Sequence, residues 1–188
     1  METLLSVFVG LGLSAACGFR IFVPLLVMSL ASRAGWLPMG AGPDWIGSTP
    51  ALIAFGVATA LEIGGYYIPW IDNLLDTVAT PAAVVAGILV TASAMTDSDP
   101  FLKWTLAVLA GGGTAGVFQG FTTIARQVST LSTGGLGNPL LATAEAGGSA
   151  VLAVLAVTLP VLAVLVVVLL LFFGVKRLLF RRPVARTP

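Results

Sequence analysis

The chain has 188 residues, of which 57% are hydrophobic and 9% are charged, and its mean hydropathy is +1.04. Soluble domains carry about 25% charged residues, so this composition excludes a soluble globular protein and indicates one membrane domain. The formal net charge of +1 gives no basis for binding nucleic acid. There is no histidine, and the lone Cys17 excludes an internal disulfide.

The first apolar stretch runs from Leu4 to about Leu30. One straight helix of this length would exceed the hydrocarbon core of a bilayer, which is about 30 Å thick. The stretch is interrupted by residues 14–20 and again by Pro24, which favours a broken or re-entrant helix over a single span. No Lys or Arg precedes it, so we expect a retained membrane segment rather than a cleaved signal peptide.

A loop over residues 33–49 leads to the next predicted helix, Ala51 to Ile68, which Pro50 begins in a favoured first-turn position. Trp70 is expected to mark the membrane interface, where tryptophan is enriched. Glu62 then lies about 12 Å inside this interface, at 1.5 Å of helix per residue. The sequence therefore predicts a carboxyl group at membrane depth.

Residues 69–80 place polar and apolar side chains on opposite sides, a pattern that suits a short helix lying in the interface. Asp72 and Asp76 are one turn apart on the polar side and are a weak candidate for a cation site. We favour the simpler interpretation, in which they belong to a solvated face. Pro81 then begins a third predicted span, which ends near Met95.

The pattern of the first segment returns after Phe101. Apolar residues are followed by Gly111–Gly113, which predicts a second break at membrane depth, like the one expected near Gly18. A glycine-rich loop over residues 132–139 comes next and contains Asn138, a candidate polar ligand.

The stretch from Leu140 to Phe173 is too long for one untilted helix. Pro160 divides it into two predicted helices, and the second, Val161–Phe173, is so apolar that we expect it to face lipid. This division gives about six membrane segments in an all-α bundle. The alternative is five spans, with 140–173 as one tilted helix.

The two halves of the chain share short motifs at nearly the same offset. The corresponding pairs are Ser48-Thr49 with Ser132-Thr133, and Glu62-Ile63-Gly64-Gly65 with Glu145-Ala146-Gly147-Gly148. We interpret them as an internal duplication within a membrane domain of residues 1–175, with repeat one at about 1–98 and repeat two at about 99–175. Because each half would hold three segments, the halves would run in opposite orientations, as in inverted-repeat transporters.

The C-terminal segment 176–188 contains five of the nine basic residues, namely Lys176, Arg177, Arg181, Arg182 and Arg186. A basic cluster beside a span favours a cytoplasmic tail. We therefore expect a protein of the cytoplasmic (inner) membrane with a cytoplasmic C-terminus. Six segments would make the N-terminus cytoplasmic as well, whereas five would place it outside.

Four charges interrupt apolar or small-residue sequence: Arg20, Glu62, Arg126 and Glu145. Ionisable groups inside a bilayer are costly and commonly mark an ion or substrate path. The two carboxyl groups suit a proton or cation site, and the two guanidinium groups suit an anion. The alternative is a structural role, with carboxylates paired to arginines. Both interpretations, and either Arg–Glu pairing, remain open at this stage.

The segment Gly18-Phe19-Arg20-Ile21-Phe22-Val23-Pro24-Leu25-Leu26 resembles the Gly-x-x-x-[aromatic]-x-Pro-Leu-Leu segment near the start of the domain-of-unknown-function 4126 family. The resemblance covers most of the chain and continues at Glu62, Pro69, Asp72, Asp76 and Pro81 and around Arg126 and Glu145. Arg20 stands where many relatives have Asn, which implies a different ligand in this subgroup. The resemblance implies a small polytopic membrane protein and supplies no activity.

Two classes of function fit these features. The first is a small secondary transporter, permease or lipid-headgroup translocator whose binding residues are Arg20, Glu62, Arg126, Asn138 and Glu145. The second is a non-transporting membrane scaffold or partner subunit. The lack of a nucleophile–base arrangement argues against an enzyme, and we expect no metal or other cofactor. Expected partners are membrane lipids, a small anionic or lipid-headgroup substrate and a second copy in a homodimer, but not nucleic acid.

Overall fold

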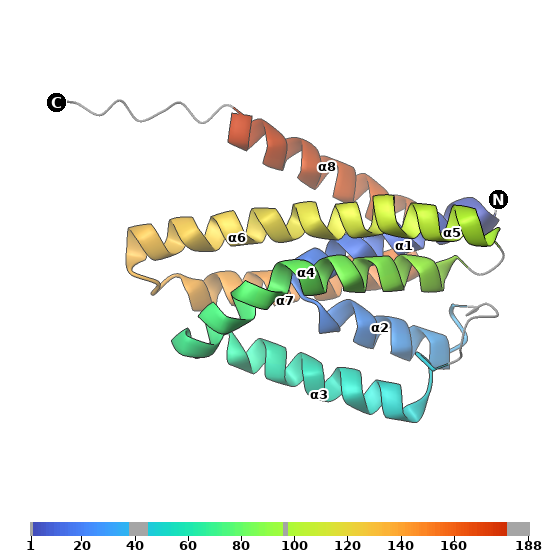
Figure 1. Ribbon diagram of the computed structural model, residues 1–188, viewed down its shortest axis with the longest axis horizontal. Coiled ribbons are helices and arrows are strands. Elements are labelled where there is room, and N and C mark those ends of the chain that lie inside the picture. Colours follow the sequence, from blue (N-terminus) through green and yellow to red (C-terminus); the bar gives the residue numbers. More distant parts are fainter. Residues whose placement is uncertain (1, 38–44, 96–97, 180–188) are drawn as a thin grey trace.

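The computed structural model describes residues 2–37, 45–95 and 98–179, and the regular structure in these residues is helical throughout (Figure 1). The prediction of an all-α fold is confirmed. Residues 180–188 of the expected basic tail lie outside the described residues. The elements are α1 (Glu2–Phe19), α2 (Phe22–Arg33), α3 (Thr49–Gly65), α4 (Pro69–Ala94), α5 (Pro100–Leu106), the π-helix η1 (Ala107–Gly112), α6 (Gly113–Thr133), α7 (Asn138–Thr158) and α8 (Pro160–Leu179).

Four helical stretches are long and apolar enough to cross a membrane, namely Leu74–Ala94, Pro100–Thr133, Asn138–Thr158 and Pro160–Arg177. The surface of α8 agrees with its predicted contact with lipid, because Leu165, Val168 and Phe172 are each more than half exposed. Helices α1, α2 and α3 are apolar but shorter. The fold is a polytopic helical bundle.

Helices α1 and α2 form a helical hairpin. Helix α1 ends at Phe19, α2 begins at Phe22, and α2 runs back toward the end of the bundle where α1 begins (Figure 1). Helix α2 has 12 residues, which is about 18 Å of helix and too short for a hydrocarbon core of about 30 Å. The break predicted near Gly18 is confirmed, and it places Arg20 in the turn between the 18-residue α1 and the 12-residue α2.

Helix α1 is the central helix and packs against α4, α6, α7 and α8. Small residues permit this packing, since a Cβ on Gly12 would lie 2.6 Å from the Cβ of Ala156 on α7. A buried hydroxyl adds a polar contact, because Ser14 donates a hydrogen bond to the carbonyl of Gly111 in η1. The turn at the end of α1 is thereby held inside the bundle on several sides.

The break expected at Gly111–Gly113 is wrong. Helices α5, η1 and α6 are continuous from Pro100 to Thr133, and the residues of η1 are wound as a π-helix. Glycine here serves close packing, because a Cβ on Gly112 would lie 2.9 Å from Cγ1 of Ile88 on α4. A single π-helical turn keeps the backbone hydrogen-bonded inside a helix, so no re-entrant loop is needed at this point.

The separate interfacial helix expected over residues 69–80 is also wrong. Helix α4 is continuous through Pro81 and bends along its length (Figure 1), as proline in membrane helices allows. Leu74 points outward and is 66% exposed, whereas Asp72 is buried. The amphipathic segment turns its two aspartates toward the protein interior and Leu74 and Val78 outward.

The division of the last apolar stretch is confirmed, because α7 ends at Thr158 and α8 begins at Pro160. The alternative of one tilted helix over 140–173 is therefore wrong. The beginning of α1 and the end of α8 lie at opposite ends of the bundle (Figure 1). The expectation that both termini lie on the same side is wrong as well, because the α1–α2 hairpin adds one reversal of direction.

One part of the correspondence between the two halves does not join equivalent positions. Ser48 caps the N-terminus of α3, where its Oγ accepts a hydrogen bond of 3.2 Å from the N–H of Ala51. Ser132 and Thr133 instead lie in the last turn of α6. The shared Ser-Thr motif therefore has different structural roles in the two halves.

Labelling of single cysteines tests the hairpin. The variants are Leu4→Cys, Trp36→Cys and Leu136→Cys, each in a Cys17→Ala background. All three replaced side chains are exposed, and Cys17 is buried. We expect cysteines 4 and 36 to react with an impermeant maleimide from the same side of the membrane, and cysteine 136 from the opposite side. The wild-type protein is the unlabelled control. Reaction of cysteines 4 and 36 from opposite sides would contradict the hairpin.

Candidate functional site

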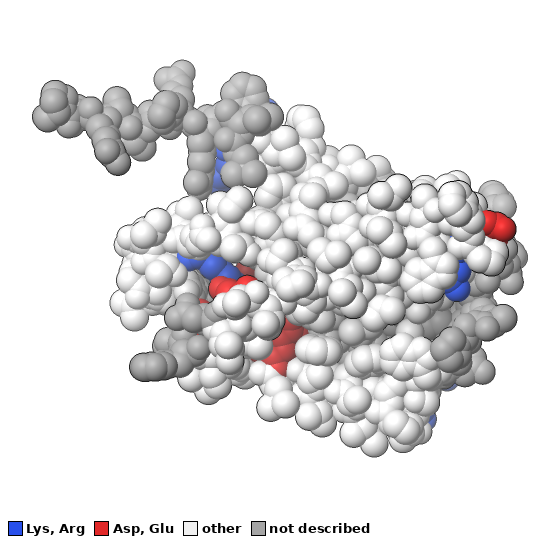
Figure 2. Space-filling model, in the orientation of Figure 1, with Lys and Arg blue, Asp and Glu red and all other residues white. Residues whose placement is uncertain are grey.

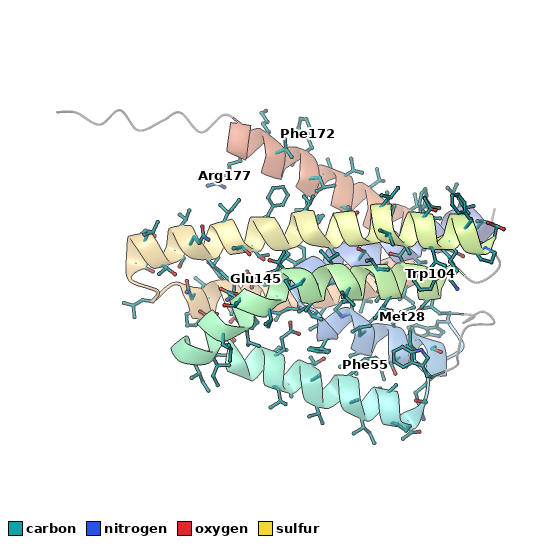
Figure 3. All side chains as sticks on the ribbon, in the orientation of Figure 1. Met28, Phe55, Trp104, Glu145, Phe172 and Arg177 are labelled. Atoms are coloured by element: carbon teal, nitrogen blue, oxygen red, sulfur yellow. The ribbon has the colours of Figure 1, made fainter. Side chains whose placement is uncertain are left out.

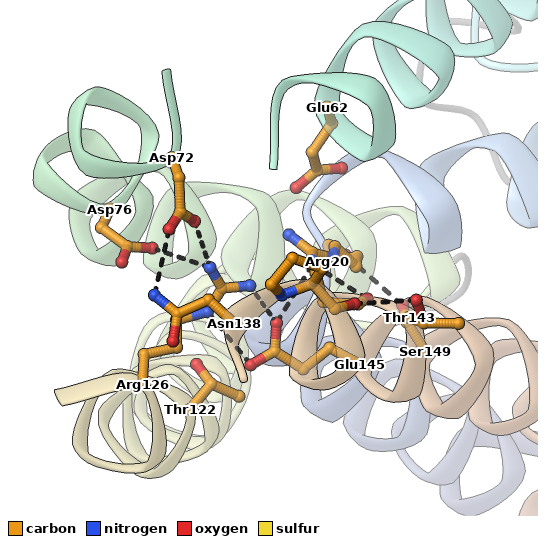
Figure 4. A network of polar contacts seen from close by, with 12 residues as sticks. Arg20, Glu62, Asp72, Asp76, Thr122, Arg126, Asn138, Thr143, Glu145 and Ser149 are labelled. Carbon is orange, nitrogen blue, oxygen red and sulfur yellow. Dashed lines mark hydrogen bonds and ion pairs between the residues drawn. The ribbon is translucent and has the colours of Figure 1, made fainter. Parts of the chain in front are cut away.

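The structure brings all seven candidate residues into one region, where their side chains point toward one another (Figure 4). We call these seven residues the polar cluster. They come from the α1–α2 turn and from helices α3, α4, α6 and α7. Its members are Arg20, Glu62, Asp72, Asp76, Arg126, Asn138 and Glu145.

Glu145 is the centre of the polar cluster because it contacts both arginines. Its Oε2 lies 3.1 Å from Nη2 of Arg20 and also contacts Nη2 of Arg126. Its Oε1 accepts a 3.2 Å hydrogen bond from Nε of Arg126, so this second pair is bidentate, a strong geometry for a carboxylate. The side chains of all three residues are at most 9% exposed.

Arg126 also has acidic partners on α4. Its Nη1 lies 2.5 Å from Oδ1 of Asp72 and 3.7 Å from Oδ1 of Asp76. The solvated face expected for these two aspartates is wrong for Asp72, whose side chain is 6% exposed, and Asp76 is half-buried at 26%. An arginine from a distant helix neutralises Asp72 inside the protein, which local sequence periodicity does not reveal.

Tyr66 completes the site and was not singled out in the sequence. Both guanidinium groups stack on its ring, with centroid distances of 3.7 Å to Cζ of Arg20 and 4.1 Å to Cζ of Arg126. Burial raises the pKa of the Tyr66 phenol well above its ordinary value. A neutral aromatic ring therefore contacts both cations that Glu145 draws together, which is a favourable cation–π arrangement.

Glu62 has a different partner from Glu145. Its carboxylate accepts hydrogen bonds from the backbone N–H groups of Ile21 at 2.8 Å and Phe22 at 3.0 Å, at the N-terminus of α2. Among the described residues no ion pair joins Glu62 to an arginine. The free N–H groups at this helix end are thus occupied by a carboxylate of the protein itself, which the helix dipole also favours.

Asn138 joins the polar cluster at the start of α7. Its Nδ2 donates to Oδ2 of Asp72 at 3.3 Å and to Oγ1 of Thr130 at 3.2 Å. Three buried polar atoms of the cluster have no hydrogen-bond partner in the part of the chain that the structure describes, namely Nε of Arg20, Oδ1 of Asp76 and Oδ1 of Asn138. Unsatisfied buried groups of this kind suit a site that takes up water or an ion.

The polar cluster has more acidic than basic groups. Arg20 and Arg126 face four carboxyl groups, those of Glu62, Asp72, Asp76 and Glu145. The space-filling view shows acidic and basic atoms together in a hollow of a face that is otherwise largely uncharged (Figure 2). Within residues 2–37, 45–95 and 98–179 there is no group of His, Cys, Asp or Glu arranged to hold a metal ion.

A family model described as domain of unknown function (DUF4126) matches residues 7–179. The chain belongs to this family. The match includes every residue of the polar cluster, which agrees with the resemblance noted in the sequence. No curated protein and no solved structure matches the chain. The description of the family names no activity, so the activity is inferred from the site.

Replacing Glu145 with glutamine tests the bridge between the arginines. We expect Glu145→Gln to lower the free energy of unfolding by about 3–5 kcal/mol, because two buried guanidinium groups lose their shared counter-charge. The matched control is Asp76→Asn, which removes a half-buried carboxylate at a longer distance and should cost at most about 1 kcal/mol. Thermal or denaturant unfolding in detergent measures both. Equal losses in the two variants would contradict the central role of Glu145.

Proposed function

We propose that the protein is a small secondary transporter of the inner membrane, with the polar cluster as the site where a proton or small cation couples to transport. The observation that carries this proposal is the excess of carboxyl groups over guanidinium groups in a buried site. Arg126 and Arg20 can neutralise two of the four carboxylates. The remaining two can take up protons or a bound cation, because partly buried negative charge without an ionic partner is unfavourable.

Glu62 is the group best placed to couple this charge to a movement. Its carboxylate holds the N-terminus of α2 through two charge-assisted hydrogen bonds, and protonation would weaken both. Helix α2 packs mainly on α3 and α7, so its release would reposition the re-entrant hairpin beside the cluster. Proton or cation occupancy and hairpin position would then be linked, as a coupled transporter requires.

The arrangement of the helices supports alternating access. Helix α2 runs opposite to α6, α3 opposite to α7, and α4 opposite to α8 (Figure 1). Glu62 lies on the middle helix of the first group and Glu145 on the middle helix of the second. An inverted repeat built in this way would place both glutamates at the interface between the two halves, where transporter sites commonly lie.

The contacts of the arginines favour a cation over an anion at the cluster. An anionic or lipid-headgroup substrate would have to displace Glu145 or Asp72, since these carboxylates already bind the guanidinium groups. We therefore assign the coupling ion to the cluster. The end of the bundle where α8 finishes is proposed to be cytoplasmic, because Lys176 and Arg177 lie there and three further arginines follow in the sequence.

The second candidate function is a non-transporting scaffold. The observation that favours it is that the cluster joins α1, α4, α6 and α7 through ion pairs, as a purely structural device would. The two functions differ in what Glu62 does. In a scaffold its loss would change stability alone, whereas in a transporter its loss would remove ion coupling from a folded protein.

Proton movement in proteoliposomes distinguishes the two functions. Liposomes containing the protein and a pH-sensitive dye are given a pH gradient, and Na⁺ or K⁺ is then added outside. We expect the wild-type protein to dissipate the gradient when one of these cations is added, and Glu62→Gln to be inactive with a thermal midpoint close to that of the wild type.

The matched control is Asp99→Asn. Asp99 is an exposed N-cap of α5, and its Oδ1 accepts from the N–H groups of Phe101 and Leu102. Asparagine caps helices equally well, so this variant should transport like the wild type. Two results together would contradict transport and favour the scaffold: the wild-type protein moves no protons with either cation, and Glu62→Gln only lowers the thermal midpoint.

A further inference from the structure

A second site lies on a different face of α6 from the polar cluster. It is a cavity of about 580 Å³ between α1, α6, α7 and α8, which is within the range of about 300–1,000 Å³ for small-molecule sites. Its lining is apolar except for one residue, Arg177. The lining consists of Phe19, Phe118, Phe121, Ile124, Ala125, Val128, Leu141, Leu170, Phe173, Gly174 and Arg177.

Aromatic rings form one wall of the cavity. Phe118 contacts Phe19 and Phe121 edge to face, with ring centroids 5.3 Å and 6.2 Å apart. Gly174 lets α8 approach this wall, because a Cβ there would lie 2.9 Å from the ring of Phe121. Beyond this contact the end of α8 diverges from α6 (Figure 1), so the apolar space has an opening beside the last turn of α8.

Arg177 lies at this opening and Lys176 does not. Arg177 points into the space between α8 and α6, whereas Phe172 is on the other side of α8 (Figure 3). The Nζ of Lys176 lies 6.0 Å from the centroid of the Phe172 ring, so the charge of Lys176 lies on the side of α8 that faces away from the cavity. One guanidinium group therefore marks the mouth of an apolar cavity.

We propose that this cavity is a binding site for an anionic phospholipid, with an acyl chain among the phenylalanines and the phosphate at Arg177. Charge and apolarity together favour this occupant, because a phospholipid carries long acyl chains and an anionic phosphate on one glycerol backbone. The basic end of α8 adjoins the leaflet that attracts it, since anionic lipids concentrate at the cytoplasmic surface. The site is independent of the polar cluster and of transport.

Native mass spectrometry of protein purified from bilayers with equal phosphatidylglycerol and phosphatidylcholine tests the site. We expect the wild type to retain phosphatidylglycerol preferentially, and Arg177→Gln to lose this preference several-fold. Lys176→Gln is the matched control, because it removes the same charge from the neighbouring residue, whose side chain does not line the cavity. It should retain the lipid like the wild type.

A second pair of variants tests the acyl chain. Ala125→Phe fills the cavity and should lower retention of both lipids. If thermal unfolding shows that Ala125→Phe is not folded, Val128→Phe serves in its place. Equal losses in Arg177→Gln and Lys176→Gln would overturn the proposal in favour of general attraction to basic residues. The proposal would also be overturned if the filled variant retained lipid as well as the wild type does. It would be overturned as well if the wild type were a dimer and the filled variant alone a monomer, since a second copy of the chain would then occupy the cavity.

Discussion

The fold depends on how Glu145 neutralises two buried arginines. A guanidinium group without a counter-charge inside an apolar bundle costs several kcal/mol, and Arg20 and Arg126 lie close enough to share one aromatic ring, that of Tyr66. Glu145 contacts both, and Asp72 adds a second counter-charge to Arg126. These contacts connect the α1–α2 turn with α4, α6 and α7, so the charged groups determine which helices meet at this point.

The α1–α2 hairpin follows from the same constraint. A chain that ends a helix inside a membrane protein must satisfy its free backbone groups within the protein, and here the carboxylate of Glu62 accepts the N–H groups of Ile21 and Phe22. The turn between α1 and α2 is therefore held by Arg20 on one side and by Glu62 on the other. A group that both carries charge and holds a helix end is suited to couple ion binding to movement, which is the basis of the proposed transport.

The sequence predicted the parts of this structure that have a strong local signal. Charges within apolar sequence identified Arg20, Glu62, Arg126 and Glu145, and proline and glycine predicted the breaks near Gly18 and Pro160. The inward orientation of Asp72 was not predictable, because an amphipathic helix reads alike whether its polar side meets water or an arginine of another helix. Gly111–Gly113 predicted a break for a similar reason, since glycine marks close helix packing as well as turns. Tyr66 has no local signal, because its role depends on two arginines distant in sequence.

A double-mutant cycle on Arg20 and Glu145 tests the central claim most directly. Arg20→Met and Glu145→Gln should each destabilise the protein, while the double variant should lose less than the sum, because it leaves no unpaired Arg20 guanidinium. Unfolding in detergent should give a coupling free energy of about 1–3 kcal/mol, within the range for contacting charged residues. If the two single losses add up to the loss of the double variant within about 0.3–0.5 kcal/mol, the two residues behave as independent sites. That result would contradict the claim that Glu145 neutralises Arg20 of the hairpin turn.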